Sequence, residues 1–367
     1  MLLFKGQRDQ LLSPLQAVCG IVEKRHTLPI LSNVLLQKQG NTLTLLATDI
    51  EIQITTSTVA PDGENAAVTV AARKLQDILR SLPDTAEVSL VLDDRRLQLK
   101  AGKSRFNLQT LPAEDFPRMT IAEGQSTRFV MTQAQMKRLI SLVQYAMAQQ
   151  DIRYYLNGLL LVAKGSDLFV VSTDGHRLAY AGEGMPEALI PIEVILPRKT
   201  VLELSRQLAD NDEALEIILT PTQARFRFGN VELISKLIDG KFPDYERVIP
   251  RNHTKVIVLD RQAMLQSLHR AAILTNEKFR GVRLVLAADS LKIISSNADQ
   301  EEAQEELEIS YSAEPLDIGF NVTYLLDVLN NLSSETVDWR FNDGNSSALI
   351  TLPGNDKFKY VVMPMRI

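Results

Sequence analysis

The densest group of reactive side chains lies in the segment Thr173-Asp-Gly-His-Arg-Leu178, near the middle of the chain. A hydroxyl, a carboxylate, an imidazole and a guanidinium surround one glycine there. Aspartate and histidine exchange protons in general acid–base catalysis, so this loop would suit an enzyme acting on a small acidic or phosphorylated substrate. A turn in which the aspartate caps its own backbone, or a binding loop, explains the same residues. Both interpretations stay open at this point.

Other motifs that carry chemistry are weak. Gly102-Lys103-Ser104 ends like a phosphate-binding loop, but Leu97 stands where that loop needs its first glycine, and no helix pattern follows. The four histidines are not at metal-ligand spacing from one another. We therefore expect no cofactor and no metal.

Length and composition limit the protein class. A chain of 367 residues suits two or three domains, and 45% hydrophobic with 23% charged residues is typical of a soluble globular protein. With one cysteine, Cys19, and a charged N-terminal segment, we expect no disulfide, no signal peptide, no membrane partner and a cytoplasmic location. The net charge of −5 disfavours a protein that coats nucleic acid with its whole surface.

The chain contains a weak internal repeat. Thr48-Asp49 returns as Thr173-Asp174, and Phe116-Pro117 as Phe242-Pro243, at nearly constant spacing. A third copy is fainter, with Asn297 at the position of Thr173. We expect three tandem domains, at 1–126, 127–250 and 251–367.

Helix and strand patterns recur with the repeat. Apolar residues at helical spacing mark one face in 75–82 and again in 325–332, and a second helix opens each unit. Short alternating runs such as 43–46, 168–171 and 291–294 indicate strands. The order of helices and strands therefore predicts that each unit is an α+β domain, with helices on one face of an antiparallel sheet. Exposed sheet edges are normally paired, so we expect units joined edge to edge and, on closure, a ring.

Charge placement suggests two contacts. The basic pair Arg73-Lys74 recurs as Arg198-Lys199, and both pairs lie on predicted helices. This recurrence favours contact with phosphates over a helix face that is only solvated. We therefore expect Arg73, Arg198 and Lys199 to contact nucleic acid. A basic segment, 100–108, and an acidic one, 299–306, lie in the first and third units. They suit a head-to-tail dimer in which Phe106 and Leu108 bury apolar area, although two unrelated surface strands would give the same pattern.

Several longer segments, spread over all three units, are very specific. They are Arg25-His-Thr-Leu-Pro-Ile-Leu, Ser104-Arg-Phe, Gln150-Asp-Ile-Arg-Tyr-Tyr-Leu-Asn-Gly, Thr173-Asp-Gly-His-Arg-Leu, Phe242-Pro-Asp-Tyr-Glu-Arg-Val, Asn276-Glu-Lys-Phe-Arg-Gly-Val-Arg-Leu and Tyr360-Val-Val-Met-Pro-Met-Arg-Ile. With them the chain resembles the bacterial DNA polymerase III beta subunit family, the sliding clamps. The resemblance implies a head-to-tail homodimer of six similar domains that encircles double-stranded DNA without reading its sequence. It further implies a non-enzymatic processivity role, with the replicative polymerase catalytic subunit, the clamp-loader complex, translesion polymerases and repair proteins as partners.

The resemblance also implies three sets of site residues. DNA contacts map onto Arg25, Gln150, Tyr154 and Tyr155. A groove for partner peptides maps onto Arg153, Leu156, Thr173, Gly175, His176, Arg177, Leu178, Pro243, Arg247, Val248, Asn345, Met363, Pro364, Met365 and Arg366. The dimer contact maps onto Lys74, Arg105, Phe106, Leu108, Ile273, Leu274, Glu301, Glu302 and Glu305.

Three positions depart from the family pattern, and one of them is Ile367, where leucine is common. Asn345 replaces a residue that is more often aliphatic, which makes that edge of the groove more polar, and Gln304 takes a place that is acidic in some members.

The first repeat keeps Thr48-Asp49 but continues Ile-Glu-Ile. Because the histidine and arginine are absent there, we favour the clamp and keep an enzyme using Thr173–Arg177 as the alternative.

Overall fold

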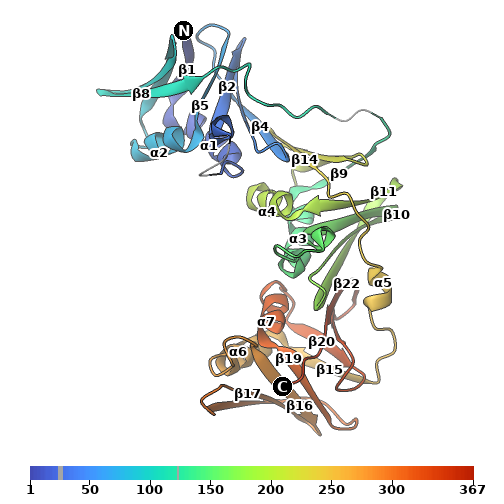
Figure 1. Cartoon of the computed structure of the whole chain (residues 1–367). Coiled ribbons are helices and arrows are strands. Elements are labelled where there is room, and N and C mark those ends of the chain that lie inside the picture. Colours follow the sequence, from blue (N-terminus) through green and yellow to red (C-terminus); the bar gives the residue numbers. More distant parts are fainter. Residues whose placement is uncertain (24–27, 122–123) are drawn as a thin grey trace. The chain divides into compact units, whose positions relative to one another are not determined.

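The computed structural model describes residues 1–23, 28–121 and 124–367 (Figure 1). Its contacts form two compact groups: Met1–Ala134 with Leu202–Leu237, and Gln135–Val201 with Ile238–Ile367. The boundaries at 126 and 250 that the repeat suggests stay a prediction. The described strands form antiparallel sheets throughout, as the alternating runs indicate.

Among the described residues, the first group contains one long sheet, two complete α-helices and parts of two others. Its sheet order is β1-β6-β7-β8-β5-β2-β3-β4-β14-β13-β12-β9. The elements are β1 (Leu2–Gln7), α1 (Arg8–Cys19), β2 (Asn33–Gln39), β3 (Thr42–Thr48), β4 (Ile52–Val59), β5 (Ala66–Ala71), α2 (Ala72–Ser81), β6 (Glu87–Asp93), β7 (Arg96–Ala101), β8 (Ser104–Leu111), β9 (Thr127–Thr132), β12 (Ala214–Leu219), β13 (Gln223–Phe228) and β14 (Val231–Lys236).

The second group contains two sheets, ordered β10-β11-β22-β21-β20-β15 and β18-β17-β16-β19. Its elements are α3 (Gln133–Val143, which starts in the first group), β10 (Gly158–Thr173), β11 (Arg177–Pro197), α5 (Tyr245–Val248), β15 (Lys255–Asp260), α6 (Arg261–Ala272), β16 (Gly281–Ala287), β17 (Ser290–Ser296), β18 (Glu302–Glu308), β19 (Leu316–Asn321), α7 (Val322–Asn330), β20 (Thr336–Phe341), β21 (Ala348–Leu352) and β22 (Asn355–Val362). Helix α4 (Arg198–Gln207) is divided between the groups.

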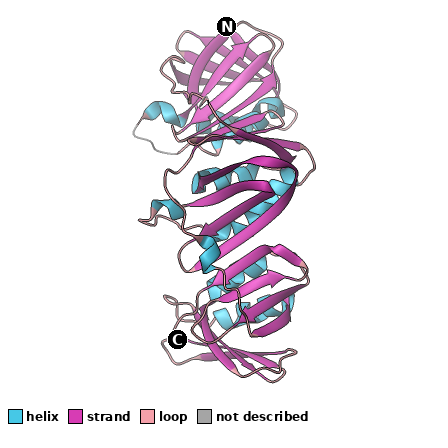
Figure 2. Ribbon diagram, turned by 90° about the vertical axis from the view of Figure 1, so that its right-hand side faces the viewer, coloured by secondary structure: helices cyan, strands magenta, loops and turns pink. Residues whose placement is uncertain are grey.

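The helices cover one face of the sheets in each group (Figure 2). In the apolar stripe of α2, Leu75 and Leu79 are fully buried and Ile78 is half-buried; in α7, Leu325 and Leu329 are fully buried. Asp260 caps the N-terminus of α6, since its side chain accepts a hydrogen bond from the Ala263 amide at 2.6 Å. Burial of these stripes fixes which face of each helix meets the sheet.

Sheet edges are joined by the same kind of strand pair in both groups. In the first group β4 pairs with β14, with Ile52 opposite Ser235. In the second, β11 pairs with β22, with Arg177 opposite Val362. The predicted edge-to-edge joining is therefore confirmed within each group. Among the described residues, β18 pairs only with β17 and so presents a free outer edge.

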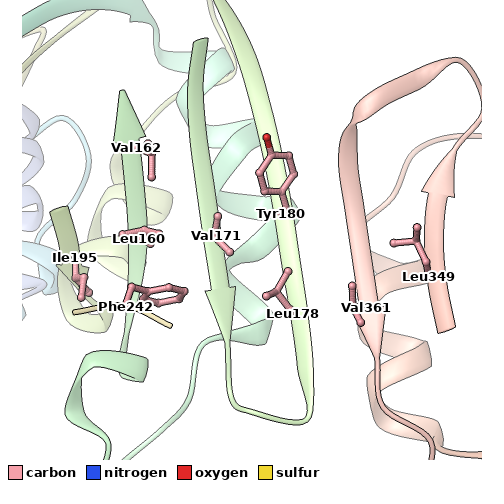
Figure 3. Packing of buried hydrophobic residues seen from close by; sticks show 9 residues of the cluster. All are labelled: Leu160, Val162, Val171, Leu178, Tyr180, Ile195, Phe242, Leu349 and Val361. Carbon is pink, nitrogen blue, oxygen red and sulfur yellow. The ribbon is translucent and has the colours of Figure 1, made fainter. Parts of the chain in front are cut away.

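An apolar cluster lies beside the Thr173–Leu178 turn (Figure 3). Phe242, from the segment before α5, packs there with Leu160 and Val171 of β10 and Leu178 of β11. The first group has a smaller counterpart, in which Phe116 packs with Leu35 and Leu46. The repeated Phe-Pro pair thus fastens a connecting segment to the sheet in both places.

Candidate functional site

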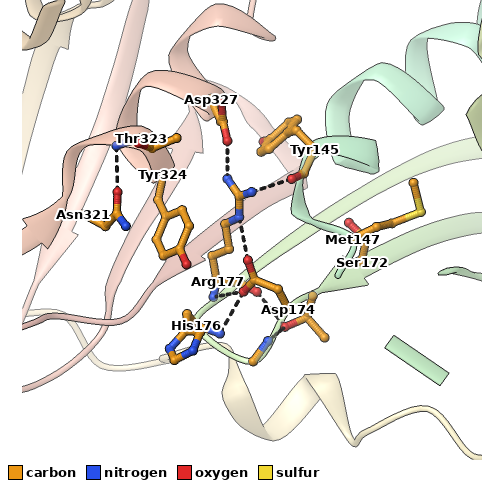
Figure 4. A network of polar contacts seen from close by, with 12 residues as sticks. Tyr145, Met147, Ser172, Asp174, His176, Arg177, Asn321, Thr323, Tyr324 and Asp327 are labelled. Atoms are coloured by element: carbon orange, nitrogen blue, oxygen red, sulfur yellow. Dashed lines mark hydrogen bonds and ion pairs between the residues drawn. The ribbon is translucent and has the colours of Figure 1, made fainter. Parts of the chain in front are cut away.

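The Thr173–Leu178 segment is a tight turn between β10 and β11 (Figure 4). The Thr173 hydroxyl donates to the Arg177 carbonyl at 2.6 Å and accepts from the Gly175 amide at 3.1 Å. Asp174 Oδ1 accepts from the amides of His176 and Arg177, at 2.9 and 3.1 Å. The polar side chains therefore close the turn, as expected of an Asx motif.

The first copy repeats these hydrogen bonds, and in the third copy Asn297 takes the part of Asp174, not the expected part of Thr173. Thr48 donates to the Ile52 carbonyl at 2.9 Å, and Asp49 Oδ1 accepts from the Ile52 amide at 2.8 Å. In the third copy Asn297 Oδ1 accepts from the amides of Asp299 and Glu301, both at 3.0 Å. A turn that needs no histidine in two of three copies is a structural device, not an acid–base site.

Arg177 braces this turn against α7 and the end of α3. Its guanidinium donates to Asp327 at 2.5 Å, to Asp174 at 3.1 Å and to the Tyr145 carbonyl at 2.6 Å. The side chain is only 9% exposed, and its guanidinium lies 4.4 Å from the centre of the Tyr324 ring. Burial raises the pKa values of Tyr145 and Tyr360, so both phenols beside Arg177 stay neutral.

The C-terminal segment reaches the turn. The Met363 amide donates to the His176 carbonyl at 3.0 Å, which places Met363 beside the turn, whereas the Met365 amide donates to the Gly319 carbonyl at 2.8 Å. His176, Met363 and Arg366 are exposed, and Leu178 is buried. We call this surface, formed by Thr173–Leu178 and Met363–Arg366, the candidate partner surface.

The remaining predicted groove residues lie on three short segments. Arg247 and Val248 are exposed on α5, and Pro243 is exposed just before it. The Arg153 side chain donates two hydrogen bonds to the Asp151 carboxylate and one, at 3.2 Å, to the Asp174 carbonyl beside Gly175. Leu156 is buried. Hydrogen bonds from Arg153 lower the pKa of Asp151 to about 2. Asn345 is exposed in the loop before β21, and Pro364 and Met365 are half-buried. Contact of all these groove residues with a partner stays a prediction.

The predicted DNA-contacting residues are placed unevenly. Arg25 lies outside the described residues. Gln150 and Tyr154 are exposed, and the Tyr154 ring meets half-buried Tyr155 edge to face with centroids 5.7 Å apart. Arg73 and Arg198 are half-buried and donate to backbone carbonyls, of Val22 and Met147 respectively; Lys199 is half-buried too. Contact with DNA stays a prediction for all of them.

The predicted dimer residues lie mainly on β8, of which only Thr110 and Leu111 pair with β5, and around the edge strand β18. On β8, Phe106 and Leu108 are half-buried and Arg105 is exposed; Lys74 is exposed on α2. Ile273 follows α6 with 76% exposure. Leu274 is half-buried beside it, and Glu301 and Glu302 are exposed at the start of β18. Glu305 already binds Arg270 within the chain, which lowers the pKa of its carboxyl.

Sequence patterns did not reveal the partners of Arg177. Tyr324 and Asp327 lie on the apolar helix α7, far from the turn in sequence. The only local signal is a carboxylate inside an otherwise apolar helix run.

No helix among the described residues is long and apolar enough to cross a membrane.

Comparisons with known proteins agree over the full length. Models of the N-terminal, central and C-terminal domains of the DNA polymerase III beta subunit match residues 2–120, 130–244 and 246–366. The beta sliding clamp of Pseudomonas putida is 50% identical over 99% of this chain and 100% of its own length, and that of Escherichia coli K12 is 45% identical over 99% and 100%.

Solved structures give the same result. The crystal structure of the Pseudomonas aeruginosa DNA polymerase III subunit beta is 48% identical, covers 100% of both chains and has a TM-score of 0.95. The Caulobacter crescentus beta sliding clamp is 39% identical, with a TM-score of 0.95 over 100% of this chain and 99% of its own. The chain therefore belongs to the DNA polymerase III beta subunit family, the non-catalytic sliding clamps of bacteria.

Proposed function

We propose that two copies of this chain close head to tail into a ring that encircles duplex DNA and tethers a polymerase. The observation that carries the proposal is the repeated strand pairing of β4 with β14 and of β11 with β22. By the same repeat, the free edge of β18 is the counterpart of β4 and β11, and β8 is the counterpart of β14 and β22. Pairing β18 with β8 of a second copy supplies the missing contact and closes the ring.

The register of that contact follows from the equivalent pairs. Leu233 lies opposite Ile54, and Tyr360 lies opposite Ala179. The corresponding pair places Ala303 opposite Phe106 of the partner subunit. Phe106 and Leu108 then lie on the helix-facing side, next to exposed Ile273, where apolar burial favours association.

A ring explains how a chain with net charge −5 stays on DNA. Encirclement holds the duplex without tight binding, so contacts from Arg25, Arg73, Gln150, Arg198 and Lys199 need only weak, salt-dependent attraction. Tyr154, exposed beside Tyr155, would stack on unpaired bases, and its exposure supports this role. Three domains, divided near 126 and 250, give six in the ring.

The candidate partner surface is the docking site for proteins that the ring carries. Buried Leu178, exposed Met363 and the exposed cation Arg366 fit a short peptide with apolar anchors. The partners we propose are the polymerase catalytic subunit, the clamp loader, translesion polymerases and repair proteins, all in the cytoplasm.

Topological retention on DNA tests the function. The full chain, loaded by a bacterial clamp loader onto nicked circular DNA, is expected to stay bound during gel filtration and to leave when the circle is cut. A ring slides off a free end, whereas a protein held by contacts alone does not distinguish the two DNAs. Equal retention on circular and linear DNA would contradict the proposal.

A further inference from the structure

A cavity of about 220 Å³ in the first group repeats the plan of the candidate partner surface. Its wall includes the Thr48–Ile50 turn, the counterpart of Thr173–Gly175, and Pro117, the counterpart of Pro243. The Lys236 amide donates to the Glu51 carbonyl at 2.9 Å, as the Met363 amide does to that of His176. The same three chain segments therefore meet in both places.

The connecting segment is held firmly over this cavity. Phe116 is buried against Leu35 and Leu46, the Met119 amide donates to Gln53 Oε1 at 2.8 Å, and Gln223 donates to the Thr120 carbonyl at 2.9 Å. A cavity lined by fixed backbone is preformed, which lowers the entropy lost when a ligand binds.

Ile50 gives a second, independent sign of a site. It stands where the partner surface has Gly175 and has φ of 70°, a left-handed conformation that a β-branched residue rarely adopts. Its side chain is nevertheless 42% exposed and lines the cavity. Backbone strain of this kind is concentrated at functional positions. Glycine at position 50 would adopt this backbone conformation without strain. The isoleucine side chain instead adds an exposed apolar surface to the cavity wall.

Charge and size indicate the occupant. The cavity is smaller than the roughly 300 Å³ at which ligand pockets begin, so it admits about one large apolar side chain. Two cations, Arg118 and Lys236, line it. The ion pair of Lys236 with Glu51 is solvent-exposed at both ends and therefore weak enough to exchange with an incoming carboxylate.

We propose that this cavity is a second peptide-docking site, which takes one apolar side chain next to an acidic residue of an extended partner segment. The apolar anchor contacts Ile50, Pro117 and Met119, and the carboxylate pairs with Lys236. A ring of two copies would then carry two kinds of docking site. Because the internal repeat relates this site to the candidate partner surface, the inference rests in part on the proposed function of that surface.

Selection of short random peptides displayed on phage, against the immobilised full chain, tests the proposal. Enriched peptides are sorted by their affinity for three variants of the cavity: Lys236→Glu, Met119→Asp and Ile50→Gly. One class is expected to contain an apolar residue beside an acidic one and to lose about tenfold in affinity for each variant. The Ile50→Gly chain is the control for folding, because glycine suits the left-handed backbone and should keep or raise the melting temperature.

Matched changes separate the two sites. Lys164→Glu makes the same charge change at an exposed position outside the cavity and should leave this class of peptides bound. His176→Ala should weaken only peptides that dock on the candidate partner surface. If peptides sensitive to His176 are found and none is sensitive to the cavity variants, the second site is wrong and the proposed function stands. If peptides sensitive to the cavity variants are found and none is sensitive to His176→Ala, the partner surface is wrong and the second site stands. If the peptides that bind the cavity contain no apolar residue, the proposed apolar anchor is wrong and the cavity binds a simple anion.

Discussion

Arg177 Nη1 lies 2.5 Å from Asp327 Oδ2, although the two residues are 150 positions apart in the chain. The contact joins the first residue of β11 to helix α7. It lies beside the turn that carries His176. The backbone of the candidate partner surface therefore rests on an ion pair in which Arg177 is 9% exposed and Asp327 33% exposed.

Removing this brace should destabilise the fold. Arg177→Met keeps the length of the side chain but leaves Asp174 and Asp327 without their cation, at a cost of about 3 kcal/mol. Arg247→Met is the matched control, because its ion pair with Asp244 is exposed, with 87% of the Arg247 side chain accessible, and contributes little. Thermal unfolding is expected to show a clear fall in melting temperature for the first variant alone; equal falls would contradict the brace.

His253 should make stability fall in mild acid. Burial, with a smaller effect of Arg340, lowers the pKa of His253, and its Nε2 is buried without a hydrogen-bond partner among the described residues. The unfolded chain accepts a proton near about pH 6.5, where the folded chain resists it. The contribution is therefore present above that pH and is lost as pH falls toward the lowered pKa.

The measurement for His253 is the melting temperature at about pH 7.5 and about pH 5.5. His253→Gln is expected to reduce the fall between the two conditions. His269→Gln changes an exposed histidine and serves as the comparison. An unaltered fall in the His253→Gln chain would show that this imidazole does not govern the acid response.

Cysteines at the proposed ring contact should form a covalent dimer. The register derived from β4 and β14 places Glu302 opposite Asn107 of the partner subunit, and both side chains are exposed in the single chain. Opposed residues of antiparallel strands lie about 4.5–5.5 Å apart at Cα, within reach of a disulfide. Under mild oxidation the double variant Asn107→Cys with Glu302→Cys is expected to migrate as a dimer on non-reducing gels, and each single variant as a monomer.

Truncating the apolar contact should separate the copies. Ile273→Ala together with Leu274→Ala removes roughly 2–5 kcal/mol for each side chain that becomes buried on association. Light scattering at micromolar concentration is expected to give the mass of one chain for this variant and of two for the parent. An unchanged mass would refute the assignment of this edge.

His176→Ala should affect partners and leave folding intact. The imidazole is exposed, and only its backbone takes part in the turn and the contact with Met363. Binding of a peptide from a polymerase tail, followed by fluorescence polarisation, is expected to weaken with no change in melting temperature. Full affinity in the variant would remove His176 from the partner surface.

Local patterns predicted the parts of the fold that depend on near neighbours. The Thr-Asp turn, the strand runs and the apolar stripes of α2 and α7 follow from spacing alone, although Leu82 and Leu332 lie just beyond the helix ends. The brace at Arg177 depends on a carboxylate far away in the chain, and no local rule identifies such a pair. Likewise Arg73 looked like part of an open basic face, whereas its guanidinium is tied to a backbone carbonyl.

The strand pairs that cross from one repeat to the next also determine where the proposed ring would part. At β4 with β14, and at β11 with β22, the polypeptide itself continues past the junction, so breaking the backbone hydrogen bonds there leaves the flanks tethered. A pair of β18 with β8 would join separate molecules and lack that tether. In the proposed ring, the junction between β18 and β8 would therefore separate more readily than the two strand pairs within each chain.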